Sequence, residues 1–200
     1  MPQETYNILI VGVGGQGVLL ASEVLSDVAV AAGFDVKKSE VHGMSQRGGV
    51  VSSHVRVAQK VYSPTIQEGQ ADILLSFEQA EGLRAVTWMK PDGIAIVSRT
   101  TIIPAIVTSS KKYHYPSNAI EDMKNKIPRV IDVEADKIAS ELGNPRLVNT
   151  ILLGVASNYL PFDQDLWSDT IRAKIKPKLV EINLTAFKRG REVRLSTVTA

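Results

Sequence analysis

The chain has 200 residues, 44% of them hydrophobic, and its 23 basic residues nearly balance 21 acidic ones. This length fits one domain with a substantial core, and the charge gives no indication of nucleic acid as the main partner. The absence of cysteine excludes disulfides, thiolate zinc sites and cysteine-ligated iron–sulfur clusters within this chain.

No signal peptide and no run near the ~20 apolar residues of a membrane helix is found, so we expect a soluble, cytoplasmic protein. The first elements alternate between strand and helix. An apolar run at 6–11 predicts a strand, and an Ala-, Leu- and Val-rich segment at 18–32 predicts a helix that ends at Gly33. Residues 35–41 form the second predicted strand. A strand, a turn, a helix and a strand make a βαβ unit, so we expect these two strands to pair in parallel through a right-handed crossover.

Later segments continue the alternation. Residues 49–58 alternate apolar with polar side chains, which predicts a strand with one buried face, and 60–63 is expected to pair back on it as a hairpin. Further strands are predicted at 72–77, 93–98 and 129–134, and further helices at 78–90, 135–142, 149–160, 165–175 and 179–190.

These elements predict a single α/β domain over residues 1–190, with a doubly wound, mostly parallel, Rossmann-like sheet and a helical C-terminal part. Residues 191–200 are expected to form a tail. The basic segment 188–194, KRGREVR, is expected to be a solvated chain end.

The turn VGVGGQGV joins the first strand to the first helix, and Gly12, Gly14 and Gly17 fall on the G-x-G-x-x-G spacing. Gly12 would permit the tight turn, Gly14 a close approach to a ligand, and Gly17 close packing of helix on strand. Gly15 and Gln16 lie between them. Because free N–H groups at a helix start favour an anion, the turn is a candidate binding site.

Two interpretations of this turn remain open. Asp35 and Glu40 lie near the distance at which an NAD enzyme places the acidic residue that binds a ribose hydroxyl. The other interpretation is a tight strand-to-helix connection that holds no ligand.

A second glycine-rich loop, SEVHGMSQRGG, is unusually polar for a connection between two strands. Its polar side chains could converge with the first turn at one edge of the sheet: Glu40, His42, Ser45, Gln46 and Arg47. An arginine between small residues suits a phosphate or a carboxylate, because its guanidinium binds two oxygens at once. The backbone can turn sharply beside a ligand or a partner at Gly43, Gly48 and Gly49. The alternative is a structural turn in which Glu40 and Arg47 pair.

Four motifs follow one another along most of the chain. GVGGQGV precedes SEVHGMSQRGGVVSSHVRV, and ELGNPRLVNTILLG (141–154) precedes EINLTAFKRG (181–190). In content and order they resemble the gamma-type domain of the 2-oxoacid:acceptor oxidoreductases. The form His-Gly-Met-Ser-Gln-Arg-Gly-Gly is most similar to the small subunits of the indolepyruvate type, whereas pyruvate-type relatives usually carry Tyr-Gly-Pro at the start of this loop.

The resemblance implies a small, non-thiamine-binding subunit that is inert alone. It would complete the active-site cleft of an enzyme that oxidatively decarboxylates a 2-oxoacid, of the indolepyruvate or aryl-pyruvate kind, to an acyl-CoA. Thiamine diphosphate, magnesium and 4Fe–4S clusters are then expected on a large partner subunit, with none bound by this chain alone. Ferredoxin would accept the electrons, and coenzyme A would be the co-substrate.

Roles for individual residues also follow from the resemblance. The turn at 12–17 and the loop around Arg47 would face the cleft shared with the partner. Arg47 would bind a phosphate of coenzyme A or the substrate carboxylate, while His42, Ser45 and Gln46 shape the site or the subunit contact. No residue is assigned a catalytic role. His42 could transfer a proton because imidazole titrates near neutral pH, but a packing or hydrogen-bonding histidine is the more frequent case.

Other polar residues are expected to be structural. His54 is placed on the polar face of its strand, at the surface or an interface, and His114 in a loop packed by its own aromatic residues. Asn149 is predicted to cap a helix, and Asn183 and Phe187 to pack on one face of the last helix.

Two other functions stay open. The first is a stand-alone NAD-dependent oxidoreductase, which rests on the glycine spacing, and NAD binding by the isolated chain would favour it. The second is a non-catalytic scaffold whose glycine loops only dock a partner. Protection of the Arg47 loop by coenzyme A in the complex would count against the scaffold.

Overall fold

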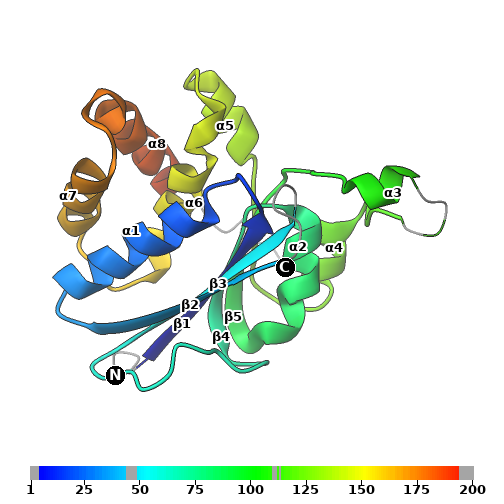
Figure 1. The fold of residues 1–200 in the computed structure, drawn as a ribbon, viewed down its shortest axis with the longest axis horizontal. Helices are drawn as coiled ribbons and strands as arrows, with labels where there is room; N and C mark the ends of the chain where they lie inside the picture. The colour runs from blue at the N-terminus through cyan, green and yellow to red at the C-terminus, as the bar shows by residue number, and fades with distance from the viewer. Residues whose placement is uncertain (1–4, 44–48, 110–111, 113, 194–200) are drawn as a thin grey trace, which may run out of the picture.

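The computed structural model describes residues 5–43, 49–109, 112 and 114–193. Six strands form one sheet within these residues, in the order β2–β3–β1–β4–β5–β6 (Figure 1). Their bounds are β1 Thr5–Val13, β2 Asp35–His42, β3 Val50–Ala58, β4 Ala71–Ser76, β5 Met89–Ser98 and β6 Val130–Val133.

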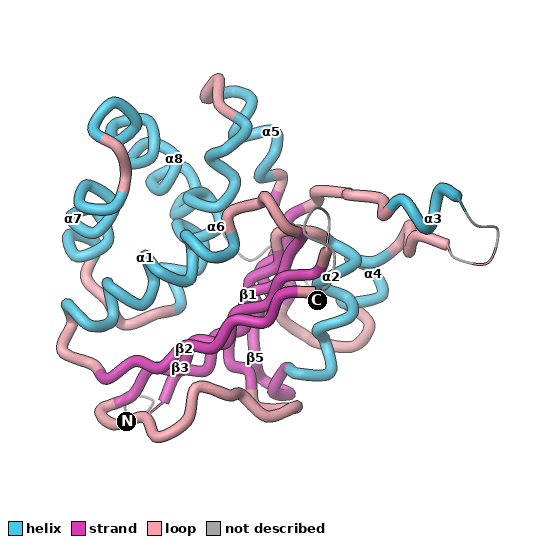
Figure 2. Tube along the Cα trace, viewed as in Figure 1, coloured by secondary structure: helices cyan, strands magenta, loops and turns pink. Residues whose placement is uncertain are grey.

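Helices cover both faces of the sheet (Figure 2). Their bounds are α1 Val18–Ala31, α2 Gln79–Ala85, α3 Ala105–Ser109, α4 Ala119–Lys124, α5 Ala135–Glu141, α6 Val148–Ala156, α7 Gln164–Lys174 and α8 Val180–Glu192. None of the helices in the described ranges is long and apolar enough to cross a membrane.

Strand β3 runs antiparallel to both of its neighbours, β2 and β1, while β1, β4, β5 and β6 pair in parallel. The doubly wound, mostly parallel sheet is therefore confirmed. The strand order follows from residue chemistry: β1 is apolar on both faces and lies inside the sheet, whereas β2 carries four charged residues and lies at its edge.

Two details of the predicted pairing were wrong. β1 and β2 are not neighbours, because β2 turns back as a hairpin and places β3 between them. Residues 60–63 belong to no strand, since both edges of β3 are already paired with β1 and β2.

Alternate residues of β1 supply two separate cores, because successive side chains of a strand point to opposite faces. Ile8 and Ile10 are buried in the larger core, under α1 and the C-terminal helices. Leu9 and Val11 are buried in the smaller core, under α2 and α4. The sheet is thus buried on both faces around the strand that leads into the glycine turn.

The C-terminal helices form a tight layer, and α8 extends beyond the predicted domain boundary at 190 to Glu192. Residues 188–192 are helical, with Lys188 and Glu192 exposed as expected of a solvated segment and Arg189, Gly190 and Arg191 packed against the rest of the chain. Arg189 lies 2.9 Å from a carboxylate oxygen of Glu141, and Arg191 donates to the Ser157 hydroxyl at 2.7 Å. These contacts hold the basic segment against the preceding helices.

Candidate functional site

The chain leaves β1 for a helix on one face of the sheet and β4 for a helix on the other. Such a switch point, at the carboxyl ends of the strands, is where open α/β sheets bind their ligands. The glycine turn, residues 12–17, lies on the β1 side of this point, and Phe77 directly follows the end of β4.

The glycines of the turn are needed for different reasons. Gly15 and Gly17 have φ of +99° and +85°, in the left-handed region that favours glycine. Gly12 has an ordinary φ, but a Cβ there would lie 2.9 Å from Cβ of Phe77 and 2.9 Å from Cγ2 of Val18. Close helix–strand packing is therefore the role of Gly12, where the spacing had assigned it to Gly17.

Gln16 fastens the turn to the neighbouring strand. Its Oε1 accepts the Val13 N–H at 2.7 Å, and its Nε2 donates to the Phe77 carbonyl at 2.8 Å. Both ends of the amide are thus already hydrogen-bonded within the protein, although Gln16 also lines the adjoining cleft.

The structure brings the ends of the second glycine-rich loop against the first turn. The Gly14 N–H donates to the Gly49 carbonyl at 2.9 Å, and the Gly43 N–H closes the hairpin on the Val50 carbonyl at 2.8 Å. His42 ends β2 beside this hairpin.

The side chain of Glu40 contacts other residues instead of the glycine turn: its Oε1 lies 2.9 Å from Lys38 Nζ and 3.4 Å from Ser22 Oγ on α1. Four of the predicted site residues, Ser45, Gln46, Arg47 and Gly48, lie outside the described residues.

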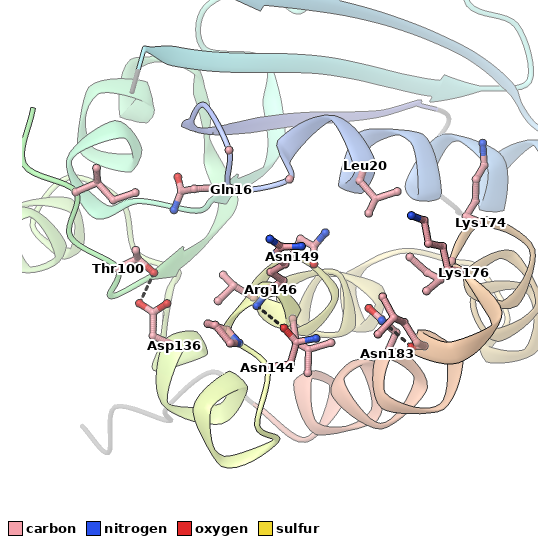
Figure 3. Close-up of a pocket in the computed structure, with 18 residues that line it drawn as sticks. Gln16, Leu20, Thr100, Asp136, Asn144, Arg146, Asn149, Lys174, Lys176 and Asn183 are labelled. Carbon is pink, nitrogen blue, oxygen red and sulfur yellow. Dashed lines mark hydrogen bonds between the residues drawn. The ribbon is translucent and has the colours of Figure 1, made fainter. Parts of the chain in front are cut away.

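A cleft of about 760 Å³ opens beside the turn, between the start of α1, the start of α6 and the connection from α7 to α8 (Figure 3). That connection contains a short 3₁₀ turn, Pro177–Leu179. The cleft is lined by backbone and small residues of the turn, by apolar side chains and by charged groups: Gly15, Gln16, Gly17, Leu20, Thr100, Ile102, Asp136, Asn144, Pro145, Arg146, Leu147, Val148, Asn149, Lys174, Ile175, Lys176, Leu179 and Asn183.

The charged groups of the cleft differ in their partners. Lys174 Nζ lies 2.8 Å from Asp27 Oδ2, and this ion pair raises the pKa of Lys174. Asp136 accepts the Thr100 hydroxyl at 2.6 Å. Arg146 and Lys176 are exposed, and neither forms an ion pair within the part of the chain that the structure describes.

The buried carboxyl group of Glu78 lies at the same end of the sheet, where the parallel strands finish. Glu78 is only 1% exposed and accepts the N–H of Glu81 at 2.9 Å, the N–H of Ile102 at 3.2 Å and the hydroxyl of Tyr115. Burial and this last hydrogen bond raise the pKa of Tyr115. Glu78 therefore holds Ile102 and Tyr115, which lie on either side of α3 in the sequence, and α3 projects from the body of the molecule (Figure 1).

The structure shows how His54 and the loop of His114 are held. His54 is buried rather than on the surface: its Nδ1 accepts the Ile66 N–H at 3.2 Å, and its ring lies edge-on to Trp88. Burial lowers the pKa of this imidazole. The loop of His114 is held through Tyr115 by Glu78, not only by its own aromatic rings.

Asn149 is not the helix cap, because α6 begins one residue earlier, at Val148. The cap in this region is Asn144, whose Oδ1 accepts the Arg146 N–H at 3.0 Å. Asn183 and Phe187 are buried as expected. Asn183 adds a polar contact, since its Oδ1 lies 2.7 Å from the Thr150 hydroxyl.

The topology argues against a dinucleotide site of the NAD type. Asp35 lies at the opposite end of β2 from the turn and pairs with Lys37 at 2.9 Å. Glu40 is near the correct end, but β3 separates β2 from β1, a distance of two strand spacings, about 10 Å. Neither carboxylate therefore lies on the strand next to the turn, where a ribose would be bound.

Among the described residues, no group of three His, Cys, Asp or Glu side chains is placed to hold a metal ion. Without cysteine the chain offers no thiolate to an iron–sulfur cluster.

Sequence reasoning missed the cations of the cleft, Arg146 and Lys176. They lie 30 positions apart in the chain, and no local pattern links them. Only the packing of α6 against α8 brings their connecting segments to the glycine turn.

Comparison with known proteins gives one consistent result. The family model described as pyruvate ferredoxin/flavodoxin oxidoreductase matches residues 7–193. The indolepyruvate oxidoreductase subunit IorB of Archaeoglobus fulgidus is 38% identical over 187 residues, which cover 92% of each chain.

Two solved structures share the fold at low identity. The gamma subunit of a keto/oxoacid ferredoxin oxidoreductase from Geobacter sulfurreducens has a TM-score of 0.68 and 21% identity, covering 92% of this chain and 95% of that one. The 2-oxoglutarate:ferredoxin oxidoreductase from Magnetococcus marinus, with 2-oxoglutarate, coenzyme A and succinyl-CoA bound, has a TM-score of 0.75 and 17% identity. The match covers 96% of this chain and 31% of that chain.

Proposed function

Since the chain belongs to the pyruvate ferredoxin/flavodoxin oxidoreductase family, we propose that it completes the active-site cleft of an indolepyruvate or other aryl-pyruvate:ferredoxin oxidoreductase. The coarser assignment, a small subunit of a 2-oxoacid:ferredoxin oxidoreductase, rests on family membership. The observation that carries the finer one is the 38% identity to an indolepyruvate oxidoreductase subunit along almost the whole of both chains.

In this proposal the redox and carbanion chemistry belongs to a large partner subunit in the cytoplasm. Thiamine diphosphate with magnesium would supply the electron sink for decarboxylation, and 4Fe–4S clusters would carry electrons to ferredoxin. The absence of cysteine in this chain supports placing the clusters on the partner. The Magnetococcus marinus complex, which holds coenzyme A and succinyl-CoA, supports coenzyme A as the co-substrate.

This chain would contribute binding and shape. We propose that the turn at 12–17 and the loop around Arg47 face the partner, with Arg47 on a coenzyme A phosphate or the substrate carboxylate. His42, Ser45 and Gln46 would shape the contact. The hydrogen bond from Gly14 to Gly49 supports this arrangement, because it anchors the end of the second loop beside the first turn.

The test of the function is a substrate comparison with the two-subunit complex and with each subunit alone. Viologen reduction is measured with indolepyruvate, phenylpyruvate, hydroxyphenylpyruvate and pyruvate, each with coenzyme A. We expect activity only from the complex, and the highest kcat/KM for an aryl pyruvate. A complex that prefers pyruvate would contradict the substrate class, and full activity of the large subunit alone would contradict the role of this chain.

Replacing Arg47 with alanine tests its proposed contact. Because one charge-assisted contact is lost, the Michaelis constant for coenzyme A or for the 2-oxoacid should rise about tenfold or more. Arg172→Ala, which removes an exposed charge on α7, is the matched control and should leave both constants unchanged. Unchanged constants in Arg47→Ala would remove this residue from the site.

A further inference from the structure

We propose that the outer edge of β2 binds a second copy of this chain, so that two six-stranded sheets join into one. β2 is the last strand on its side of the sheet, and no strand in the described part of the chain pairs with its outer edge. The second copy would add its own β2, antiparallel to the first, about a two-fold axis perpendicular to the sheet. All the groups involved belong to this chain, so the inference does not depend on the function proposed above.

The hydrogen bonds of the β2–β3 hairpin show which backbone groups of β2 face outward. The Gly43 N–H donates to the Val50 carbonyl at 2.8 Å, so these two residues form a hydrogen-bonded pair. Such pairs recur at every second residue of an antiparallel ladder, so the odd-numbered residues of β2 are bonded to β3. The N–H and C=O groups that point to the outer edge are therefore those of the even-numbered residues: Val36, Lys38, Glu40 and His42.

The charges of β2 select one register for the added strand. With Ser39 on the two-fold axis, Lys38 of each copy lies opposite Glu40 of the other copy. A register with Lys38 or Glu40 on the axis would instead place that residue opposite its own copy, and like charges directly opposite each other are destabilising. In the register centred on Ser39, even-numbered residues face one another across the axis, so their outward N–H and C=O groups are paired.

The charges of β2 do not repel a second copy of the strand. Edge strands avoid pairing by carrying charged side chains, lysine above all. In β2 each lysine has an acidic partner on its own strand: Lys38 Nζ lies 2.9 Å from Glu40 Oε1, and Lys37 Nζ lies 2.9 Å from Asp35 Oδ1. The strand carries two charges of each sign, so two copies meet without excess charge.

The same register covers an exposed apolar side chain. Val36 packs against the core under α1, so the odd-numbered residues of β2 point to the other face of the sheet. On that face Val41 is 57% exposed. Pairing about Ser39 places Val41 opposite Lys37 of the second copy, and the aliphatic part of the lysine side chain would shield the valine from water.

Cross-linking through a single cysteine tests the register, because the chain has no cysteine of its own. In Ser39→Cys the two copies of residue 39 would face each other in a non-hydrogen-bonded pair, with Cα atoms about 4.5 Å apart, a distance that a disulfide spans. We expect mild oxidation of the purified full-length variant to give a covalent dimer. Lys37→Cys is the matched control on the same face of β2, because its two copies would lie about 13 Å apart along the strands, out of reach of a disulfide.

Light scattering on the purified full-length chain measures the association itself. We expect a wild-type mass twice that of one chain. Lys38→Glu should raise the dimer dissociation constant about tenfold or more, because two like-charge pairs replace two attractive ones. Adding Glu40→Lys to this variant restores opposite charges across the axis and should restore the dimer. Lys188→Glu makes the same charge change at an exposed position of α8 and should dimerise like the wild type.

A wild type that stays monomeric at its highest soluble concentration would overturn the proposal. Equal cross-linking of Ser39→Cys and Lys37→Cys would overturn the register, and so would a dimer that Lys38→Glu leaves unchanged. The two cysteine variants decide the matter even where circular dichroism shows that Lys38→Glu is unfolded. None of these measurements uses a substrate or a partner subunit, so their failure is distinct from a failure of the 2-oxoacid function.

Discussion

Gly17 carries two constraints that can be separated by experiment. Its φ of +85° is almost the same as the +84° of Gly33, but only Gly17 has a neighbour, Asn149, within reach of a Cβ. Gly33→Ala should lower the free energy of unfolding by about 1–2 kcal/mol, the cost of a left-handed alanine. Gly17→Ala should cost more, because the Asn149 amide must also move. Urea unfolding of both variants measures the difference, and equal losses would show that Asn149 yields freely.

His54 makes the stability depend on pH. Burial lowers its pKa below the ordinary value of 6.5, so as the pH falls the unfolded chain takes up the proton first. The contribution of His54 is therefore complete above about pH 6.5 and is lost as the pH falls through this value toward the folded pKa. Unfolding free energies of the wild type and His54→Gln between pH 8 and pH 5 should converge at the acidic end.

The exposed His114 supplies the control for this measurement. His114→Gln should keep the pH profile of the wild type, since the side chain of His114 is exposed in the folded chain. A wild-type profile parallel to that of His54→Gln would contradict the assigned burial effect.

At the scale of single residues, sequence predicts conformation better than contacts. The spacing of the turn glycines correctly singles out a special backbone, but it exchanges the roles of Gly12 and Gly17, which depend on Phe77 and Asn149 far along the chain. His54 occupies one of the polar positions in the alternating pattern of its strand, but the segment around Ile66 covers its side chain. Such burial is decided by connections whose path has no periodic signal.

The packing of α6 on α8 depends on two glycines. A Cβ at Gly154 would lie 2.2 Å from the Phe187 carbonyl oxygen, and one at Gly190 would lie 2.0 Å from that of Ile151. Backbone atoms cannot move aside as side chains do, so the helices can approach this closely only without Cβ atoms. This close approach of the two helices explains why the motifs at 141–154 and 181–190 each end in glycine.

Gly154→Ala should therefore destabilise the fold, although alanine is the better helix former. We expect a loss of about 3 kcal/mol or more in unfolding free energy, at the upper end of overpacking effects. In Gly82→Ala on α2 the new Cβ meets the side-chain oxygen of Ser76 at 2.9 Å, so a smaller loss is expected. Thermal or urea unfolding compares them. A gain in stability for Gly154→Ala would contradict the close approach of the helices.

At the scale of elements, the predicted strands and helices largely coincide with those of the structure, because both apolar periodicities are strong. The pairing of strands was harder to predict. Nothing in the periodicity of β2 and β3 distinguishes a crossover from a hairpin. The charges of β2 at Asp35, Lys37, Lys38 and Glu40 were the available sign of an edge strand.

In the whole molecule, the glycine turn, the buried carboxyl group of Glu78 and the cleft with its cations all lie at the carboxyl ends of the parallel strands. The insertion of β3 next to β1 moves β2 away from the turn, so the fold departs from the NAD-binding arrangement that the glycine spacing also suggests. Fold class and family could be inferred from the sequence. The cleft could not, because it is assembled from connections between helices that are distant in the chain.

Co-purification tests the central claim, that this chain works as the small subunit of a larger redox enzyme. The tagged chain is isolated from its own cells under native conditions, and partner mass, iron–sulfur absorbance and viologen reduction with indolepyruvate and coenzyme A are recorded. We expect a large, brown partner and activity that depends on coenzyme A. A colourless chain without a partner, active only with NAD or not at all, would contradict this claim.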